Sequence, residues 1–89
     1  MNSEQKRKLK QQCHDLKPVV WIGQNGLTEN VLTEVNQALD DHELIKIKIA
    51  TGDKTDKTNI AEKICHEMKA EFIQGIGSMY SFYRENSEK

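Results

Sequence analysis

The spacing of hydrophobic residues divides the 89-residue chain into seven segments. Three segments carry hydrophobic residues three or four positions apart, which is the spacing of one face of an α-helix. Four shorter segments are either continuously apolar or alternate between apolar and polar residues, as strands do. In chain order the pattern predicts αβαβαββ: one α/β domain over residues 1–89, with a core from about 3 to 84, in which helices pack on a mixed four-stranded sheet.

The first helix is predicted over residues 3–14, with Ser3 as its capping residue. The second helix is expected to start directly after Gly26, and the third to be capped by Asp53 or Thr55. Each has one apolar stripe that would face the sheet. The stripes are Leu9, Cys13 and Leu16; then Leu27, Val31, Val35, Ala38 and Leu39; and finally Ile60, Ala61, Ile64, Cys65 and Met68.

The strands are predicted over residues 19–22, 44–50, 71–74 and 79–84, with a hairpin turn over residues 75–77. In the second strand, the isoleucines at 45, 47 and 49 face one way and Lys46 and Lys48 the other. The chain holds one Trp, two Tyr and two Phe. Trp21 and the group Tyr80, Phe82 and Tyr83 could stack on bases, as aromatic residues do in proteins that bind single strands. In so small a domain we expect most of these rings in the core.

Composition points to a small, highly charged domain. Charged residues make up 30% and hydrophobic residues 36% of the chain, and the mean hydropathy is -0.76. No apolar run approaches the roughly 20 residues that span a bilayer, and the polar N-terminus leads into no signal sequence. We therefore expect a cytoplasmic monomer without membrane contact, in which Cys13 and Cys65 are reduced thiols.

Charge is unevenly distributed along the chain. The formal net charge of -1 argues against a nucleic-acid partner, yet residues 6–17 hold five basic side chains and a single acid, Asp15. A local basic patch can bind polyanions whatever the net charge, but a solvated helix face explains the same pattern. The five basic residues are Lys6, Arg7, Lys8, Lys10 and Lys17.

The segment Gly23-Gln24-Asn25-Gly26 follows an apolar strand and precedes a helix. Glycines allow the backbone to approach a ligand closely, and a helix N-terminus attracts anions, so the turn is a possible phosphate cradle. A tight strand-to-helix connection is the other interpretation. The arrangement is not that of a KH loop, which joins two helices, and it lacks the third glycine of a Rossmann fingerprint and the Gly-Lys-Ser/Thr of a P-loop.

Three segments at their observed separations resemble the CRM domain, in particular its stand-alone bacterial form, the YhbY family. They are KPVVWIGQNGL at 17–27, HELIKIKI at 42–49 and IGSMYSFYR at 76–84. The resemblance covers roughly residues 3–84. It implies an RNA-binding domain folded like the C-terminal domain of translation initiation factor three. It also implies a non-enzymatic assembly factor that associates with precursors of the large ribosomal subunit. Where the chain departs from the more basic family members, we expect weak intrinsic affinity for ribosomal RNA, with binding helped by ribosomal proteins.

The resemblance places RNA contact at the turn, and we expect Lys17 and the basic first helix to add charge if that helix lies beside it. Lys46 and Lys48 either face RNA or form the ordinary solvated side of a strand. The chain departs from more basic family members at the neutral Gln24-Asn25, at Ser78, and in lacking a basic tail. The candidate RNA-binding residues are Gly23, Gln24, Asn25, Gly26, Lys6, Arg7, Lys10, Lys17, Lys46, Lys48 and Arg84.

We expect no catalytic site, metal or cofactor. Adjacent residues on a helix diverge by about 100°, so neither Cys13-His14 nor Cys65-His66 can easily chelate zinc. Both cysteines fall on apolar stripes and are expected to be buried and inert. The alternative to RNA binding is a protein-interaction module that presents an acidic second-helix region to a basic partner. That region comprises Glu29, Glu34, Asp40, Asp41 and Glu43.

Overall fold

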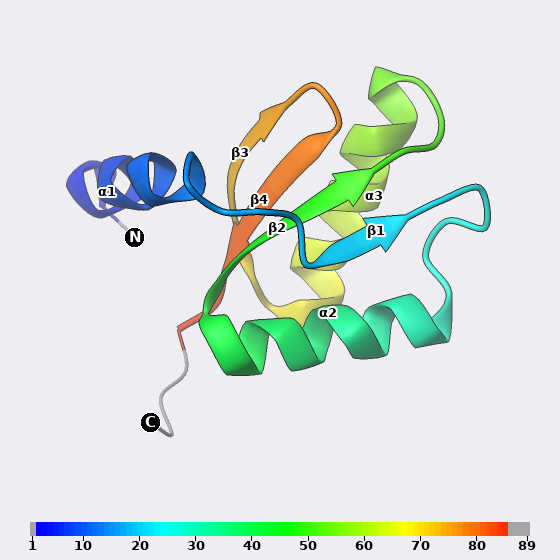
Figure 1. The fold of residues 1–89 in the computed structure, drawn as a ribbon, viewed down its shortest axis with the longest axis horizontal. Coiled ribbons are helices and arrows are strands. Elements are labelled where there is room, and N and C mark those ends of the chain that lie inside the picture. The colour runs from blue at the N-terminus through cyan, green and yellow to red at the C-terminus, as the bar shows by residue number, and fades with distance from the viewer. Residues whose placement is uncertain (1, 86–89) are drawn as a thin grey trace.

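The computed structural model describes residues 2–85 and has the predicted order of elements, αβαβαββ (Figure 1). Three helices pack around a mixed four-stranded sheet, which confirms the predicted fold class. The elements are α1 (Ser3–Cys13), β1 (Val20–Ile22), α2 (Glu29–His42), β2 (Leu44–Ile49), α3 (Lys54–Met68), β3 (Glu71–Ile76) and β4 (Met79–Tyr83).

The sheet has the strand order β1-β2-β4-β3. β1 runs parallel to β2, whereas β2 with β4 and β4 with β3 are antiparallel. Trp21 of β1 lies opposite Lys48 of β2, which in turn lies opposite Met79 of β4. Because β1 and β2 run parallel, their carboxyl ends meet at the same border of the sheet, where the turn over residues 23–26 begins.

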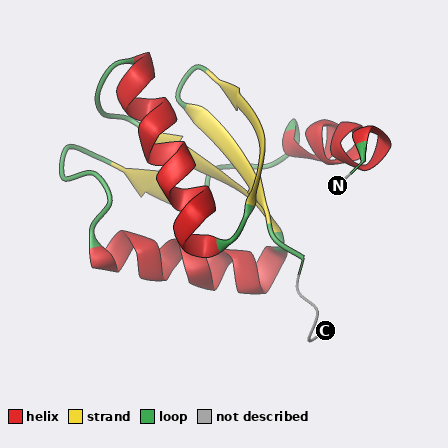
Figure 2. Cartoon of the chain, turned by 180° about the vertical axis from the view of Figure 1, so that it is seen from behind, coloured by secondary structure: helices red, strands yellow, loops and turns green. Residues whose placement is uncertain are grey.

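One face of the sheet is closed by α2 and α3, which lie together on the same side (Figure 2). The residues that point to this face are almost fully buried because both helices turn their apolar stripes towards it. This cluster comprises Val20, Ile22, Val35, Ala38, Leu39, Ile45, Ile47, Ile49, Ala61, Ile64, Tyr80 and Phe82.

The opposite face is covered only in part. Leu9 and Cys13 of α1 pack against Leu44 of β2 and Ile73 of β3 in a second, smaller cluster. The register of β3 shifts between Phe72 and Gln74, so that Ile73 can join this cluster while Phe72 packs against the rings of Tyr80 and Phe82 on the closed face. The rest of this face has no helix over it within the described residues (Figure 1).

Several predicted boundaries were wrong by one or two residues. Asn2, not Ser3, caps α1, since its side chain accepts from the N–H of Gln5 at 2.8 Å. β3 continues through Gly75 to Ile76, so the hairpin turn is the two-residue Gly77-Ser78. Gly77 has φ +60°, which a glycine adopts without steric cost and which fixes the turn one residue later than predicted.

Two further features concern the helices. Asp53 caps α3 in a capping box with Asp56, as one of the two predicted alternatives. Cys13 is fully buried, as expected, but Cys65 is only partly buried because its side of α3 lies at the rim of the core. Between residues 2 and 85, no helix combines the length and the apolar character needed to cross a membrane.

Candidate functional site

The segment over residues 23–26 forms a hydrogen-bonded β-turn. The N–H of Gly26 donates to the carbonyl oxygen of Gly23 at 3.0 Å, and Gly26 has φ +66°. Gln24 and Asn25 stand exposed at the tip. Within the described part of the chain, their backbone N–H groups donate no intramolecular hydrogen bond, so they are available to an acceptor from outside. A Cβ at Gly23 would meet no atom within 4 Å, which leaves the backbone there open to approach.

The expectation that α2 starts directly at the turn is wrong. α2 begins at Glu29, and Thr28 caps it by accepting the N–H of Val31 at 3.2 Å. Leu27 lies before the helix and packs against the core, which sets this later start. One of the N–H groups expected to hold a phosphate, that of Val31, is therefore already bonded to Thr28, and the helix begins three residues after the turn.

The condition under which α1 would add charge to the turn is not met, because α1 does not lie beside it. Figure 1 shows α1 at the left end of the longest axis and the loop between β1 and α2 at the right end. Lys6, Arg7 and Lys10 are all exposed, but they add their charge at α1, away from the turn. The apolar stripe of α1 packs on Leu44 and Ile73, which fixes the helix at the far side of the sheet.

The uncovered part of the sheet begins beside the turn. We call it the open sheet face and define it by the outward residues of the four strands: Trp21, Lys46, Lys48, Gln74, Ile76, Met79 and Ser81, of which Ser81 is itself buried. Lys46 and Lys48 do point away from the isoleucines of β2, as predicted, and both are half-buried. We expected most aromatic rings of the chain to lie in the core, but Trp21 is 64% exposed and lies outside it.

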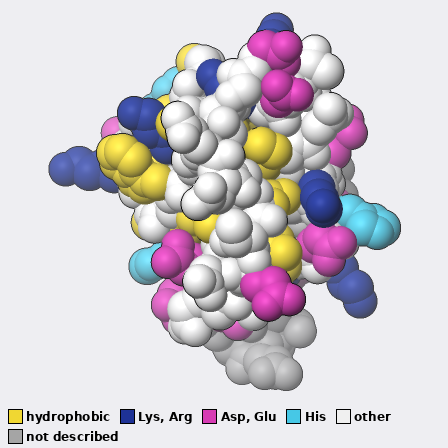
Figure 3. Space-filling view, turned by 90° about the vertical axis from the view of Figure 1, so that its right-hand side faces the viewer, with side chains coloured by type: hydrophobic (Ala, Val, Ile, Leu, Met, Phe, Trp, Pro, Cys, Tyr) yellow, Lys and Arg dark blue, Asp and Glu magenta, His cyan; other side chains and the backbone are white. Residues whose placement is uncertain are grey.

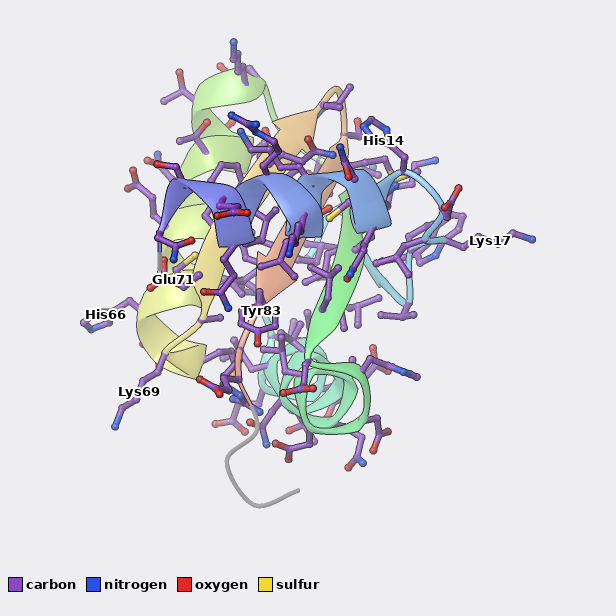
Figure 4. The ribbon with its side chains drawn as sticks, turned by 90° about the vertical axis from the view of Figure 1, so that its left-hand side faces the viewer. His14, Lys17, His66, Lys69, Glu71 and Tyr83 are labelled. Carbon is purple, nitrogen blue, oxygen red and sulfur yellow. The ribbon has the colours of Figure 1, made fainter. Side chains whose placement is uncertain are left out.

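Two shallow hollows extend the open sheet face towards α1. His14, Lys46, Gln74, Ile76, Met79 and Ser81 line one of about 140 Å³. Lys17 and Lys46 lie together in the second, which is bounded by the linker after α1. Lys17 itself points away from the domain, on the same side as His14 (Figure 4). The structure thus groups Lys17, Lys46 and Lys48 on one side, and leaves the α1 residues as a separate basic surface.

Arg84 holds the fold together instead of standing free for a ligand. Its guanidinium donates to Oδ1 and the carbonyl oxygen of Asn36 at 3.0 and 3.2 Å and to the carbonyl oxygen of Met68 at 3.1 Å. It also pairs with Asp40 at 2.7 Å, and only 21% of its side chain is exposed. One side chain therefore ties β4 to α2 and to the end of α3, a role that the sequence reasoning missed.

A second missed residue is Lys57 of α3. Its Nζ donates to Oγ of Ser78 at 3.1 Å, at the tip of the β3–β4 hairpin. Ser78 stands where more basic family members were expected to carry a basic side chain, and Lys57 brings a positive charge to that place from another element. The residues are 21 positions apart, so no local sequence pattern signals the contact.

Acidic side chains are spread over the surface, where some of them lie beside Lys and Arg side chains (Figure 3). Figure 3 shows hydrophobic side chains beside Lys and Arg side chains at its left edge, and Asp and Glu side chains at the top and in the lower half. On α2, Asp40 pairs with Arg84 and Asp41 accepts from the side chain of Gln37 at 3.3 Å. The acidic region is thus partly used within the fold.

The described residues offer little for catalysis. No group of three or more His, Cys, Asp or Glu side chains between residues 2 and 85 could hold a metal ion. Burial, followed by the charges of Glu71 and Glu62, raises the pKa of the Cys65 thiol above its ordinary value. A raised pKa keeps the thiol protonated and weakens it as a nucleophile. Cys65 lines a hollow of about 610 Å³ between α3 and β3 that includes Phe72 and Tyr80.

The fold and this site define a class: a small α/β domain with one closed sheet face and one open face that carries lysines beside a Gly-x-x-Gly turn. The model of the CRS1 / YhbY (CRM) domain family matches residues 1–84. The chain therefore belongs to the CRM domain family, as the resemblance of its motifs indicated.

Individual relatives agree with this assignment. The chain is 42% identical over 86 residues to the Pseudomonas aeruginosa protein named "Probable RNA-binding protein PA4753", covering 97% of this chain and 83% of the relative. It is 46% identical over 88 residues to a Haemophilus influenzae protein named "RNA-binding protein", and this match covers 99% of this chain and 89% of the relative. Among solved structures, the Staphylococcus aureus protein SAV1595, described as a candidate RNA-binding protein, matches with a TM-score of 0.86 at 33% identity, covering 98% and 91%.

Proposed function

We propose that this protein binds RNA through the turn over residues 23–26 and the open sheet face. The observation that carries the proposal is the uncovered half of the sheet, where Lys46 and Lys48 project beside that turn. The names of the relatives at 42% and 46% identity, which are RNA-binding proteins, support it. Phosphates would be bound by the lysines through charge and by the free N–H groups of Gln24 and Asn25 through hydrogen bonds.

The distribution of charge suggests how RNA would lie on the domain. Lys17 and Lys46 line the hollow between the open sheet face and the linker after α1. A strand of RNA that starts at the turn and crosses this face would reach α1, where Lys6, Arg7 and Lys10 could extend the contact. Arg84 is left out of the interface because its guanidinium is bound within the fold.

We infer that the RNA is ribosomal and that the protein acts on precursors of the large ribosomal subunit as a non-enzymatic assembly factor. The support for this step is the membership of the CRM family and the resemblance to its stand-alone bacterial form. Few basic side chains lie on the open sheet face, so we expect modest affinity for free RNA and added contacts with ribosomal proteins inside the particle. The protein would act as a monomer.

Binding is tested by fluorescence anisotropy with labelled fragments of large-subunit ribosomal RNA. Affinity should fall as salt rises from about 50 to 200 mM, with a log–log slope of about -0.7 to -0.9 per phosphate neutralised. The double variant Lys46→Gln, Lys48→Gln should lower affinity and flatten the slope by about one to two. Lys63→Gln, an exposed lysine of α3, is the matched control and should change neither.

Two outcomes would contradict the proposal. An equal loss with Lys63→Gln would show that only overall charge matters, and binding without salt dependence would argue against phosphate contacts. The ribosomal step is tested separately by sedimentation of the tagged protein on a sucrose gradient. Co-sedimentation with large-subunit precursors, lost after nuclease treatment of the RNA, is the expected result; a profile confined to the top fractions would overturn it.

A further inference from the structure

Trp21 is an exposed aromatic residue in the middle of a strand. Its neighbours on β1, Val20 and Ile22, are 3% and 0% exposed, whereas Trp21 is 64% exposed. It is the only Trp in the chain. A large apolar ring exposed to water does not give the stabilisation that burial would give. Its exposure is therefore better explained by contact with a ligand than by a role in the stability of the fold.

Lys48 holds the indole in place. The two residues are direct partners in the parallel register of β1 and β2, and the Nζ of Lys48 lies 4.9 Å from the centroid of the Trp21 ring. At this distance the ammonium group is attracted to the ring face. Lys48 therefore occupies one face of the indole, and the other face and the edges of the ring are exposed to solvent.

The surroundings favour a planar, charged ligand over an apolar protein surface. On the open sheet face the row of Trp21 runs across the strands through Lys48 and Met79 to Ile76, which is 60% exposed. The next row holds Lys46, Gln74 and Ser81, of which Ser81 is buried. Such a mixed surface is unlike the continuous apolar patches that bind protein partners. A single exposed ring beside an ammonium group fits a base with its attached phosphate, since every base offers a π-face for stacking.

We propose that Trp21 is a stacking platform for an unpaired RNA base, with Lys48 bound to the phosphate of the same or the next nucleotide. This inference rests on the proposed RNA-binding function and narrows its ligand to single-stranded or looped-out nucleotides. Trp21 and Gly23 are two residues apart, which is about 6.5 Å along a strand. A base on Trp21 and a phosphate at the turn would thus belong to neighbouring nucleotides. Stacking of this kind tolerates any base, so we expect little sequence preference at this position.

The intrinsic fluorescence of the chain tests the proposal directly, because all of its tryptophan emission comes from Trp21. The probes are a ten-nucleotide single-stranded RNA of mixed sequence, the same strand annealed to its complement, and poly-glutamate as a stand-in for an acidic protein segment. We expect the single strand to quench the emission and the duplex and poly-glutamate to change it little at equal bound fraction. Equal quenching by the duplex, or by poly-glutamate, would overturn stacking on a base.

Three variants measure the contribution of the ring. Trp21→Leu keeps an apolar side chain but removes the π-face, and should weaken binding of the single strand by about five- to 150-fold without changing the salt slope. Trp21→Phe should restore most of the affinity. Phe72→Leu is the matched control: its ring is 39% exposed and packs with Tyr80 and Phe82 on the closed face, so its loss should leave affinity within about twofold.

The outcomes separate this inference from the function on which it rests. If the unaltered protein binds no RNA with salt-dependent affinity, the proposed function fails. Suppose instead that the unaltered protein binds RNA without a change in its tryptophan emission, and that Trp21→Leu binds RNA with the same affinity. The proposed function then stands, and the stacking of a base on Trp21 is overturned. Circular dichroism and thermal unfolding of each variant confirm that the fold is intact, which the exposure of Trp21 leads us to expect.

Discussion

The two faces of the sheet are built from strands with the same alternating pattern but are completed differently. On the closed face, α2 and α3 bury Ile45, Ile47 and Ile49 to 1% exposure or less. On the other face, α1 covers Leu44 and Ile73, and the row from Trp21 across Lys48 is left in contact with solvent. The same strands therefore serve stability through the residues of one face and are free to bind through the alternate residues of the other.

This difference shows where function can be placed in so small a domain. A chain of 89 residues has material for one main core, and the closed face holds it. Side chains on the open sheet face can change without loss of that core, provided that they do not pack against α1. We expect substitutions on the two faces to separate into effects on folding and effects on binding.

The sharpest test of this comparison is Phe82→Ala on the closed face. Phe82 is fully buried and packs edge-on against Phe72 with ring centroids 6.0 Å apart. Loss of the ring should lower the free energy of unfolding by about 3–5 kcal/mol, because a cavity is added to the lost burial. Urea denaturation followed by circular dichroism measures it. In a domain of this size such a loss is a large fraction of the whole free energy of unfolding.

The partner measurement is the stability of Trp21→Leu on the open sheet face. Since Trp21 is 64% exposed, its free energy of unfolding should stay within about 0.5 kcal/mol of that of the unaltered chain. If the same urea measurement gave a free energy of unfolding lower by about 2 kcal/mol or more, the ring of Trp21 would be needed for the stability of the fold. The distinction between a closed and an open face would then be lost.

The order and type of the elements could be predicted from the sequence because both depend on local spacing. The stripes of α2 and α3 and the alternation in β2 gave the right helices, strand and burial. Trp21 could not be placed in this way. A run of four apolar residues indicates a strand buried on both faces, and only the position of α1, set by contacts with Leu44 and Ile73, shows that nothing covers this ring.

The candidate site was predictable only in its local parts. The Gly-x-x-Gly turn and the outward direction of Lys46 and Lys48 follow from neighbouring residues. The contacts of Arg84 join residues 16 to 48 positions apart, and that between Lys57 and Ser78 joins residues 21 apart. No periodicity of the sequence indicates such pairs. The sequence therefore suggested a phosphate contact for Arg84, whereas the structure shows its guanidinium bonded within the fold.

Arg84→Ala sharpens the comparison at the border between fold and interface. Removing the guanidinium takes away the hydrogen bonds that it donates to Asp40, Asn36 and the carbonyl oxygen of Met68. We expect a loss of about 1–2 kcal/mol in the free energy of unfolding, at the lower end for charged hydrogen bonds because Asp40 is partly exposed. Urea denaturation is again the measurement.

The salt dependence of RNA binding decides between the two roles of Arg84. If it serves the fold alone, the log–log slope of Arg84→Ala should equal that of the unaltered protein under conditions in which both are folded. A slope reduced by about one would instead identify a phosphate contact. Arg84→Lys keeps the charge but not the planar fork, so it should lose stability and keep the slope.

The smallest expected effect compares the two ends of the turn. Gly26 has φ +66°, in the left-handed region, so Gly26→Ala should lower the free energy of unfolding by about 1 kcal/mol. Gly23 is not among the residues with positive φ, and a Cβ added there would meet no atom within 4 Å. Gly23→Ala should therefore unfold at the same urea concentration as the unaltered chain. If RNA nonetheless approaches the backbone closely, the added methyl group of Gly23→Ala will weaken binding in the anisotropy assay while stability is unchanged. Unchanged affinity would place the RNA away from Gly23, and the interface would then rest on the sheet lysines and Trp21 rather than on the turn.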